Sequence, residues 1–259
     1  MSEPIVFYDI PRAHSTFPWS PNTWHTRYAL NIKGIPYRTE LVEFPDIEPV
    51  LKKIGAAPST KWADGRPQYT VPAIHDPSTG VTISDSDNII EYLEKQYPSP
   101  SLVPKGSLGL IMAFRSAFTE VVGDQLFALA IAGVTHHLSP RSAEYFRRTR
   151  EEIFGKKLED IILGGIDSGS EGAEKCWTAA QDGLNTLASW YNKNEALGKS
   201  LYLFGDSVTY ADVLVAARLL FIREILGKDS KGWERIKSFD GGRWERFLNN
   251  FEKYHTNNS

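Results

Sequence analysis

Strands and helices are both expected in the first part of the chain, because its apolar positions follow two different periods. Short or alternating apolar runs, which are typical of strands, cover residues 5–8, 37–44, 69–75 and 80–84. Helical spacing of apolar residues covers the run that ends at Gly34 and the segments 46–55 and 84–97. The expected order is β-α-β-α-β-β-α, with a polar surface loop at 57–68.

The second part of the chain shows only helical spacing. Three prolines punctuate a linker at 98–104, and the apolar pattern beyond it predicts helices at 108–136, 142–163, 171–192 and 209–226. A small α/β domain at 1–98 followed by an all-helical domain at 105–259 accounts for this change of period.

Composition narrows the functional classes. The net charge of −3 does not favour nucleic acid, which normally requires a basic face. The chain has one cysteine, Cys176, so neither an intramolecular disulfide nor a two-cysteine redox site is possible. No secretory signal and no uninterrupted apolar run of about 18 residues is seen, and we expect a cytoplasmic protein without a membrane span.

Ser20 and Pro21 predict the start of a helix after the first strand. Serine suits the N-cap, and proline suits the first helical position, where its missing N–H is not needed. A hydroxyl at this place lies beside the positive end of a helix, which favours an anion such as a thiolate. On local grounds alone, a simple capping role for Ser20 is the favoured interpretation.

Two further local patterns could hold a peptide-like ligand. Pro72 within an apolar strand indicates an edge, a bulge or a cis bond, and a cis bond would leave the backbone of Val71 free to pair with an extended ligand. Asp85 and Ser86 begin a helix, where a hydroxyl and free N–H groups could hold a carboxylate. Edge-strand proline and ordinary capping remain the alternatives.

Other patterns are interpreted as structural. Thr209 and Asp212 have the spacing of a capping box before an apolar helix. The pair His136-His137 lacks the partners of a zinc site, so we expect no metal.

Together these patterns resemble the cytosolic glutathione transferase family. The resemblance runs from Ile5 to about Leu226 and rests on the segments SPNTWHTRYAL, YTVPAI, DSDNIIEYL and GDSVTYADVLVAARL. It implies a thioredoxin-like first domain, an all-α second domain, glutathione as co-substrate and a homodimer.

The resemblance also implies roles for individual residues. Ser20 matches the hydroxyl that holds the glutathione sulfur in serine-type members, with Asn22 and Thr23 as lower-ranked candidates. Val71 and Pro72 match the site of the cysteinyl unit, and Asp85 and Ser86 match the pair that holds the γ-glutamyl end. This chain departs from the family at Ala57–Gln68, where many members carry a compact Asn-Pro element before the cis-proline strand. The residues that compete for the glycyl carboxylate are therefore Lys52, Lys53, Lys61, Arg66 and Gln68, of which we favour Gln68 and Lys53.

The long first loop and the extended segment Ala57–Gln68 are most similar to a fungal-specific class related to bacterial β-etherases, which cleave lignin-type aryl ethers with glutathione. An aromatic substrate site between the domains is expected, although core packing explains the last three side chains of the set equally well: Phe17, Trp19, Trp24, Phe114, Phe118 and Phe127. The leading hypothesis is a transferase acting on aromatic electrophiles. The alternatives are a ligandin that sequesters phenolic or polyaromatic compounds, and a regulatory protein that uses the same fold.

Overall fold

The computed structural model describes residues 3–161, 167–195 and 201–256, and the chain divides into two compact units. The first unit contains the chain up to Ser101, the segment Leu138–Tyr145 and the chain from Lys253 onward. The second unit contains Leu102–His137 and Phe146–Glu252. The sequence pattern did not predict that two later segments would belong to the first unit.

A four-stranded mixed sheet forms the centre of the first unit, which has the expected thioredoxin-like order. Its strands are β1 (Ile5–Asp9), β2 (Tyr37–Leu41), β5 (Ala73–Asp76) and β6 (Val81–Ser84), arranged β2-β1-β5-β6. Only the β1–β2 pair is parallel. Four predicted strands are present, but two have other bounds. The second ends at Leu41 rather than at residue 44, because Phe44 and Pro45 begin a 3-10 turn. The third begins at Ala73 rather than at residue 69, after a proline that has no N–H to donate.

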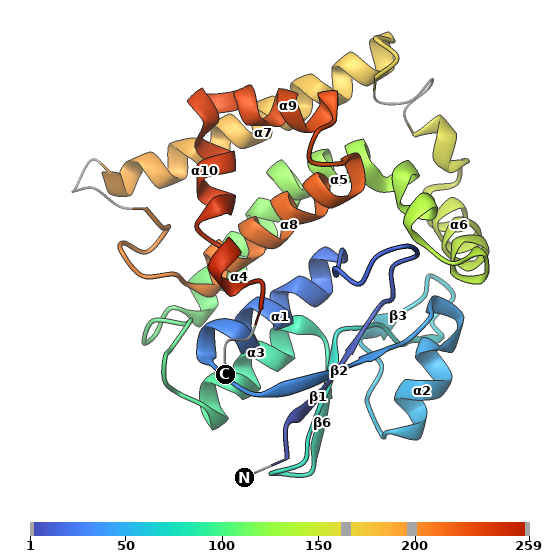
Figure 1. Cartoon of the computed structure of the whole chain (residues 1–259), viewed down its shortest axis with the longest axis vertical. Helices are drawn as coiled ribbons and strands as arrows, with labels where there is room; N and C mark the ends of the chain where they lie inside the picture. Colours follow the sequence, from blue (N-terminus) through green and yellow to red (C-terminus); the bar gives the residue numbers. More distant parts are fainter. Residues whose placement is uncertain (1–2, 162–166, 196–200, 257–259) are drawn as a thin grey trace. The chain divides into compact units, whose positions relative to one another are not determined.

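Three α-helices cover this sheet: α1 (Pro21–Lys33), α2 (Ile47–Lys53) and α3 (Ser86–Gln96). α1 and α3 lie against each other on one side of the sheet, and α2 lies on the other side (Figure 1). Gly34 ends α1 as predicted, with a φ of 64° that glycine adopts without a steric cost.

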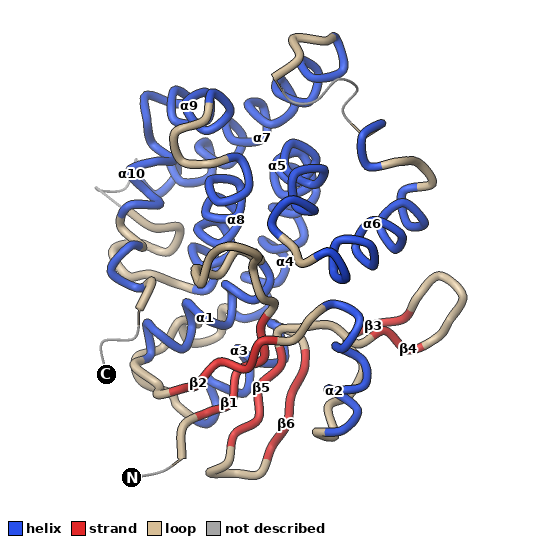
Figure 2. Tube along the Cα trace, turned by 45° about the vertical axis from the view of Figure 1, so that its right-hand side comes forward, coloured by secondary structure: helices blue, strands red, loops and turns tan. Residues whose placement is uncertain are grey.

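The segment 57–68 contains more structure than the surface loop expected from its polar sequence. β3 (Thr60–Lys61) and β4 (Pro67–Gln68) pair as a short antiparallel ladder apart from the main sheet (Figure 2). Each strand has only two residues, too few for alternation to be visible in the sequence.

The later segments of the first unit are held to it by polar contacts. The Ser142 hydroxyl accepts a hydrogen bond from the Phe44 N–H at 3.0 Å, and Arg141 pairs with Asp46. Near the C-terminus, the Asn31 amide donates to the Tyr254 carbonyl at 2.7 Å. These contacts span long sequence separations, so no local pattern indicates them.

Helices dominate the second unit. The α-helices are α4 (Leu108–Phe118), α5 (Asp124–Ala130), α6 (Pro140–Phe154, whose first turns belong to the first unit), α7 (Glu171–Glu195), α8 (Tyr210–Leu226), α9 (Lys231–Ser238) and α10 (Arg243–Asn249). Shorter turns of helix are η1 (Phe44–Asp46, in the first unit), η2 (Thr119–Gly123), η3 (Ile131–His137), η4 (Leu158–Asp160), η5 (Phe239–Gly242) and η6 (Glu252–Tyr254). The four predicted helices are present, but the second ends at Phe154 rather than at residue 163, because Gly155 has a φ of 64° that breaks the helix. Residues 162 and 163 of that prediction lie outside the described residues. α9 and α10 were not predicted.

The first long helix is interrupted by the π-helical turn η2, against which α7 packs closely. A Cβ atom at Gly183 of α7 would lie 2.4 Å from the Val121 carbonyl oxygen, so only glycine permits this approach. The segment Leu108–His137 is long and apolar enough to cross a bilayer by length and composition alone. In this structure 44% of its most apolar window is buried within the protein, and helices packed in a protein core can meet the same criterion of length and composition.

Candidate functional site

One edge of the sheet collects the ends of three strands and the starts of two helices. Tyr8 is paired with Ala73, and Ala73 is paired with Ser84. The end of β1, the start of β5 and the end of β6 therefore meet at the same edge. α1 follows the loop after β1, and α3 follows β6 directly, so both helix N-termini open at this edge.

Ser20 is the N-cap of α1, as predicted, but its side chain does not cap the helix. Its φ and ψ are −69° and 126°, Pro21 follows at the first helical position, and no capping hydrogen bond is formed. Within the described residues no other hydrogen bond to the Ser20 hydroxyl is found, and the residue is 5% exposed. The first turn of α1 has no acidic side chain. The hydroxyl and the positive helix end are therefore available to an anion.

The two lower-ranked candidates beside Ser20 differ from it. The Thr23 hydroxyl donates to the Ser20 carbonyl at 3.1 Å, and the residue is fully buried. Asn22 is exposed at the start of the helix. Thr23 is thus committed to the local backbone, whereas Ser20 is not.

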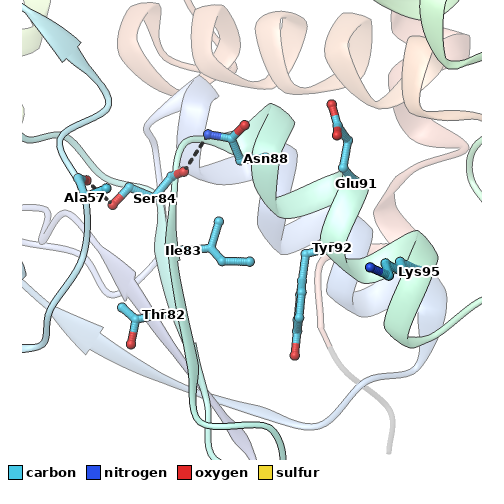
Figure 3. Close-up of a pocket in the computed structure, with 8 residues that line it drawn as sticks. All are labelled: Ala57, Thr82, Ile83, Ser84, Asn88, Glu91, Tyr92 and Lys95. Atoms are coloured by element: carbon cyan, nitrogen blue, oxygen red, sulfur yellow. Dashed lines mark hydrogen bonds between the residues drawn. The ribbon is translucent and has the colours of Figure 1, made fainter.

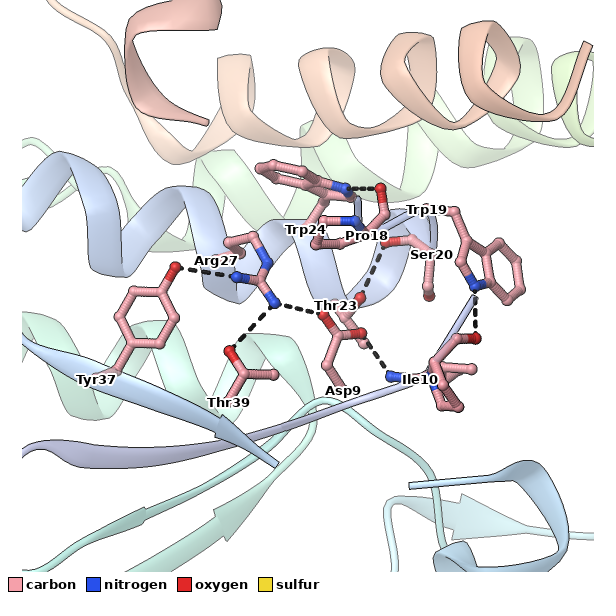
Figure 4. A network of polar contacts seen from close by, with 11 residues as sticks. Asp9, Ile10, Pro18, Trp19, Ser20, Thr23, Trp24, Arg27, Tyr37 and Thr39 are labelled. Carbon is pink, nitrogen blue, oxygen red and sulfur yellow. Dashed lines mark hydrogen bonds and ion pairs between the residues drawn. The ribbon is translucent and has the colours of Figure 1, made fainter. Parts of the chain in front are cut away.

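A buried ion pair fixes the strand and helix that flank Ser20 (Figure 4). One Asp9 oxygen accepts from the Ile10 N–H at 2.7 Å, and the other accepts from Arg27 Nη2 at 2.8 Å. Arg27 also donates to the Tyr37 hydroxyl at 3.1 Å. This pair was not predicted from the sequence. Asp9 at the end of an apolar strand could have indicated it, because a buried carboxylate normally has a cationic partner.

The peptide bond between Val71 and Pro72 is cis, one of the expected alternatives. The Pro72 carbonyl accepts from the Asp85 N–H at 3.2 Å. The N–H and carbonyl of Val71 form no backbone hydrogen bond within the described ranges. These two groups can therefore pair with an extended ligand.

Asp85 and Ser86 begin α3 at the same edge. Asp85 has a φ of 77°, a conformation that costs a non-glycine residue of the order of 1–3 kcal/mol, and its carboxylate caps the helix by accepting from the Asp87 N–H at 2.8 Å. Ser86 is buried, and its hydroxyl lies 3.4 Å from Nδ1 of His25 in α1. His25, which the sequence analysis did not select, thus links the starts of α1 and α3.

The residues predicted to bind the glycyl carboxylate differ in whether they already form an ion pair. Lys52 pairs with Glu48 at 2.6 Å. Arg66 pairs with Asp64 at 2.6 Å. Lys53 is exposed at the end of α2, and Gln68 lies half-buried in β4. Lys61 is exposed in β3, so these contacts do not separate it from Lys53. Lys53 and Gln68 stay the favoured pair, as a prediction.

The aromatic residues of the first loop mostly hold the loop together. The Trp19 indole donates to the Pro11 carbonyl at 3.2 Å, and the Trp24 indole donates to the Pro18 carbonyl at 3.0 Å. Both tryptophans are buried, with Trp24 0% exposed, whereas Phe17 is half-buried and packs on Trp24. Of these three, Phe17 is the side chain with surface left for a ligand.

The three phenylalanines of the second unit also differ. Phe118 is buried and stacks on Phe114, which in turn meets Trp190 edge to face. Phe127 is half-buried and stacks on Phe221. Core packing, the alternative noted above, accounts for Phe118, while Phe114 and Phe127 retain exposed surface.

A hollow of about 420 Å³ lies between β6 and α3 in the first unit (Figure 3). On its floor the Ser84 hydroxyl donates to the Ala57 carbonyl at 2.9 Å, and the Asn88 amide donates to the Ser84 carbonyl at 3.2 Å. These bonds brace the turn from β6 into α3 that carries Asp85 and Ser86.

The expected capping box of α8 is present. Asp212 accepts from the Thr209 N–H at 2.9 Å and from the Thr209 hydroxyl at 2.8 Å. It also accepts from the Leu203 N–H and the Tyr191 hydroxyl, both at 2.9 Å. Burial raises the pKa of Asp212 above its usual value, against the effect of these donors. No group of three potential metal ligands occurs among the described residues.

Comparisons with known proteins agree with this architecture in both units. Models described as "Glutathione S-transferase, N-terminal domain" and "Glutathione S-transferase, C-terminal domain" match residues 19–96 and 109–254. Glutathione transferase GSTFuA3 from Phanerochaete chrysosporium is 44% identical, with 98% of each chain covered and a TM-score of 0.91. A glutathione S-transferase of Ceriporiopsis subvermispora, solved in complex with glutathione, gives the same values. The glutathione S-transferase-like protein ustS of Aspergillus flavus is 29% identical, covering 92% of this chain and 86% of its own length.

Proposed function

Because the chain belongs to the glutathione S-transferase family, we propose that it activates the glutathione thiol with the Ser20 hydroxyl for attack on aromatic electrophiles. The observation that carries this proposal is the Ser20 hydroxyl, which lies at a helix N-cap without capping the helix. A free thiol has a pKa of about 8.5, and lowering that pKa by about two units requires about 2.7 kcal/mol of preferential thiolate stabilisation. A serine hydroxyl donor and the uncompensated positive end of α1 are both suited to supply it.

The other groups at this sheet edge fit the rest of glutathione. The unpaired backbone of Val71 suits the cysteinyl unit, and the carboxylate of Asp85 and the hydroxyl of Ser86 suit the γ-glutamyl ammonium and carboxylate. Lys53 and Gln68 are assigned to the glycyl carboxylate. The glutathione complex of the Ceriporiopsis relative supports this co-substrate.

The proposed reaction transfers the glutathione sulfur to carbon. The thiol proton leaves to solvent as the thiolate forms. The sulfur then bonds to an electrophilic carbon, and the bond from that carbon to an ether oxygen or a halide breaks with its electron pair. Aryl ethers are included as one substrate class because the first loop resembles the fungal-specific class related to β-etherases. A serine cannot form the mixed disulfide of cysteine-type members, so transfer is favoured over thiol reduction.

The test is steady-state turnover of glutathione with an aryl ether and with an activated aryl halide. We expect Ser20→Ala to lower kcat/KM at least about tenfold, which corresponds to about 1.4 kcal/mol of transition-state stabilisation. Ser230→Ala is a matched control, because Ser230 is also an N-cap serine but its hydroxyl does cap its helix, accepting from the Trp233 N–H at 3.0 Å. This control should keep its activity.

Two outcomes contradict the proposal in different ways. Full turnover by Ser20→Ala would remove Ser20 from the mechanism. No turnover by the wild type, with binding of glutathione and of a fluorescent aromatic ligand retained, would favour the ligandin alternative.

A further inference from the structure

His25 of α1 brings an imidazole to the start of α3. Its Nδ1 lies 3.4 Å from the Ser86 hydroxyl oxygen, although the two residues are 61 positions apart in the chain. Both residues are buried, His25 with 7% and Ser86 with 3% of its surface exposed. Because α1 and α3 pack against each other within the first unit, this contact joins the helix that follows Ser20 to the helix that begins at Ser86.

The start of α3 is less favourable to a ligand carboxylate than the start of α1. Asp85 is the N-cap of α3 and Asp87 lies in its first turn, whereas the first turn of α1 has no acid. The two carboxylates that flank Ser86 in the chain counteract the positive helix end. A ligand carboxylate held there therefore depends on hydrogen-bond donors, and the Ser86 hydroxyl is such a donor only if its hydrogen points at the ligand.

The imidazole of His25 determines where that hydrogen points. A hydroxyl group can accept and donate at the same time, but it has only one hydrogen to donate. If Nδ1 of His25 carries a hydrogen, it donates to the Ser86 oxygen, and the Ser86 hydrogen is directed elsewhere. If Nδ1 carries none, it accepts the Ser86 hydrogen and turns it away from a ligand. The tautomer of His25 thus sets the direction in which Ser86 donates.

We propose that His25 is a positioning residue, whose Nδ1–H donates to the Ser86 oxygen and so directs the Ser86 hydroxyl hydrogen to the α-carboxylate of the γ-glutamyl unit. This inference rests on the proposed function, because it takes glutathione as the ligand. Binding of the carboxylate selects the tautomer with a hydrogen on Nδ1, since only that form leaves the Ser86 hydrogen for the anion. The separation of 3.4 Å is long for such a bond, and hydrogen bonds of this kind often tighten only in the complex.

The test measures how strongly the protein prefers a ligand that has the α-carboxylate. Isothermal titration calorimetry of the full chain compares S-methylglutathione with an analogue in which 4-aminobutanoyl replaces γ-glutamyl, so that only this carboxylate is missing. Neither ligand has a free thiol. The wild type should bind S-methylglutathione at least about tenfold more tightly, as expected for a hydrogen bond to a charged group. His25→Leu should reduce this ratio of affinities at least about threefold.

Two amide variants separate the position of the donor from its presence. Asparagine places an amide nitrogen where histidine has Nδ1, and glutamine places it one bond farther, so His25→Asn should keep most of the ratio and His25→Gln should not. His75→Leu is the matched control, because Nδ1 of His75 lies 2.9 Å from the Thr82 hydroxyl in the same unit. That contact is of the same kind but joins two strands, so the control should keep the wild-type ratio.

A double-mutant cycle tests whether His25 acts through Ser86. Ser86→Ala should lower the ratio by itself, and adding His25→Leu should lower it no further. A residue with only a structural role would weaken the binding of both ligands alike and leave the ratio unchanged.

The failure of this inference can be distinguished from the failure of the proposed function. Equal affinity of the wild type for the two ligands, or a wild-type ratio in His25→Leu, would overturn the role of His25 alone. If His25→Leu does not fold, equal ratios in His25→Asn and His25→Gln would have the same meaning. Ser20→Ala should bind both ligands as the wild type does, because neither has a thiol. A wild type that binds neither ligand would contradict the glutathione site and this inference together.

Discussion

α1 and α8 both begin with a hydroxyl-bearing N-cap residue, Ser20 and Thr209, but only the Thr209 hydroxyl is bonded within its own helix start. At α8, the N–H and hydroxyl of Thr209 both donate to Asp212, which is itself buried in the first turn. At α1, the Ser20 hydroxyl makes no capping bond, and the first turn has no acid. The first arrangement closes a helix end with the chain's own groups, and the second leaves a hydroxyl and a positive helix end for a ligand. An N-cap hydroxyl indicates a site only where the fold does not already use it.

The largest expected effect is on the closed helix start. Asp212→Ala should lower the free energy of unfolding by about 3 kcal/mol, because three donors besides the Thr209 hydroxyl, two of them buried and one part-buried, lose their acceptor at about 1 kcal/mol or more each. Urea unfolding followed by circular dichroism measures this loss. Asp229→Ala, at an exposed aspartate after the same helix, should change stability by less than about 0.5 kcal/mol. A loss below about 1 kcal/mol for Asp212→Ala would mean that the α8 start does not hold the fold.

Both helix starts were predictable because capping is local. The residues that define each helix start are close in sequence: Ser20 is followed directly by Pro21, and Asp212 comes three residues after Thr209. The apolar periods that predict the main strands and helices are local in the same way. The short ladder β3–β4 was missed because two-residue strands show no period. α9 and α10 lie beyond the last segment that carried the resemblance.

Contacts between distant segments were not predictable from the sequence. His25 approaches Ser86 across 61 positions, and Tyr254 accepts from Asn31 across 223. Hydrophobicity alone also did not separate a ligand surface from a core, since Trp24 was expected in a substrate site and is fully buried. Whether the Ser20 hydroxyl caps its helix is likewise invisible in the sequence, and the structure supplied that distinction.

The comparison can be sharpened by removing each hydroxyl alone and measuring stability. Thr209→Ala should cost about 1 kcal/mol, as is typical for the loss of a used cap. Ser20→Ala should stay within about 0.5 kcal/mol of the wild type, because no capping bond is lost. Urea denaturation of the two variants in parallel decides between these values. Equal losses would show that the Ser20 hydroxyl caps α1 in solution, and the contrast between the two helix starts would then disappear.

The smallest expected effect comes from giving α1 the acid that α8 already has. Asn22 is exposed in the first turn, and Asn22→Asp should stabilise the helix by about 0.3–1 kcal/mol through its N-terminal charge. The same negative charge should disfavour a bound thiolate by a similar amount, so the pKa of the glutathione thiol in the complex should rise by roughly half a unit. Thiolate absorbance against pH measures this shift, and Asn22→Ala separates the added charge from loss of the amide. A more stable variant with an unchanged thiol pKa would mean that the charge at the start of α1 does not act on the sulfur, and Ser20 would then have to act through its hydroxyl alone.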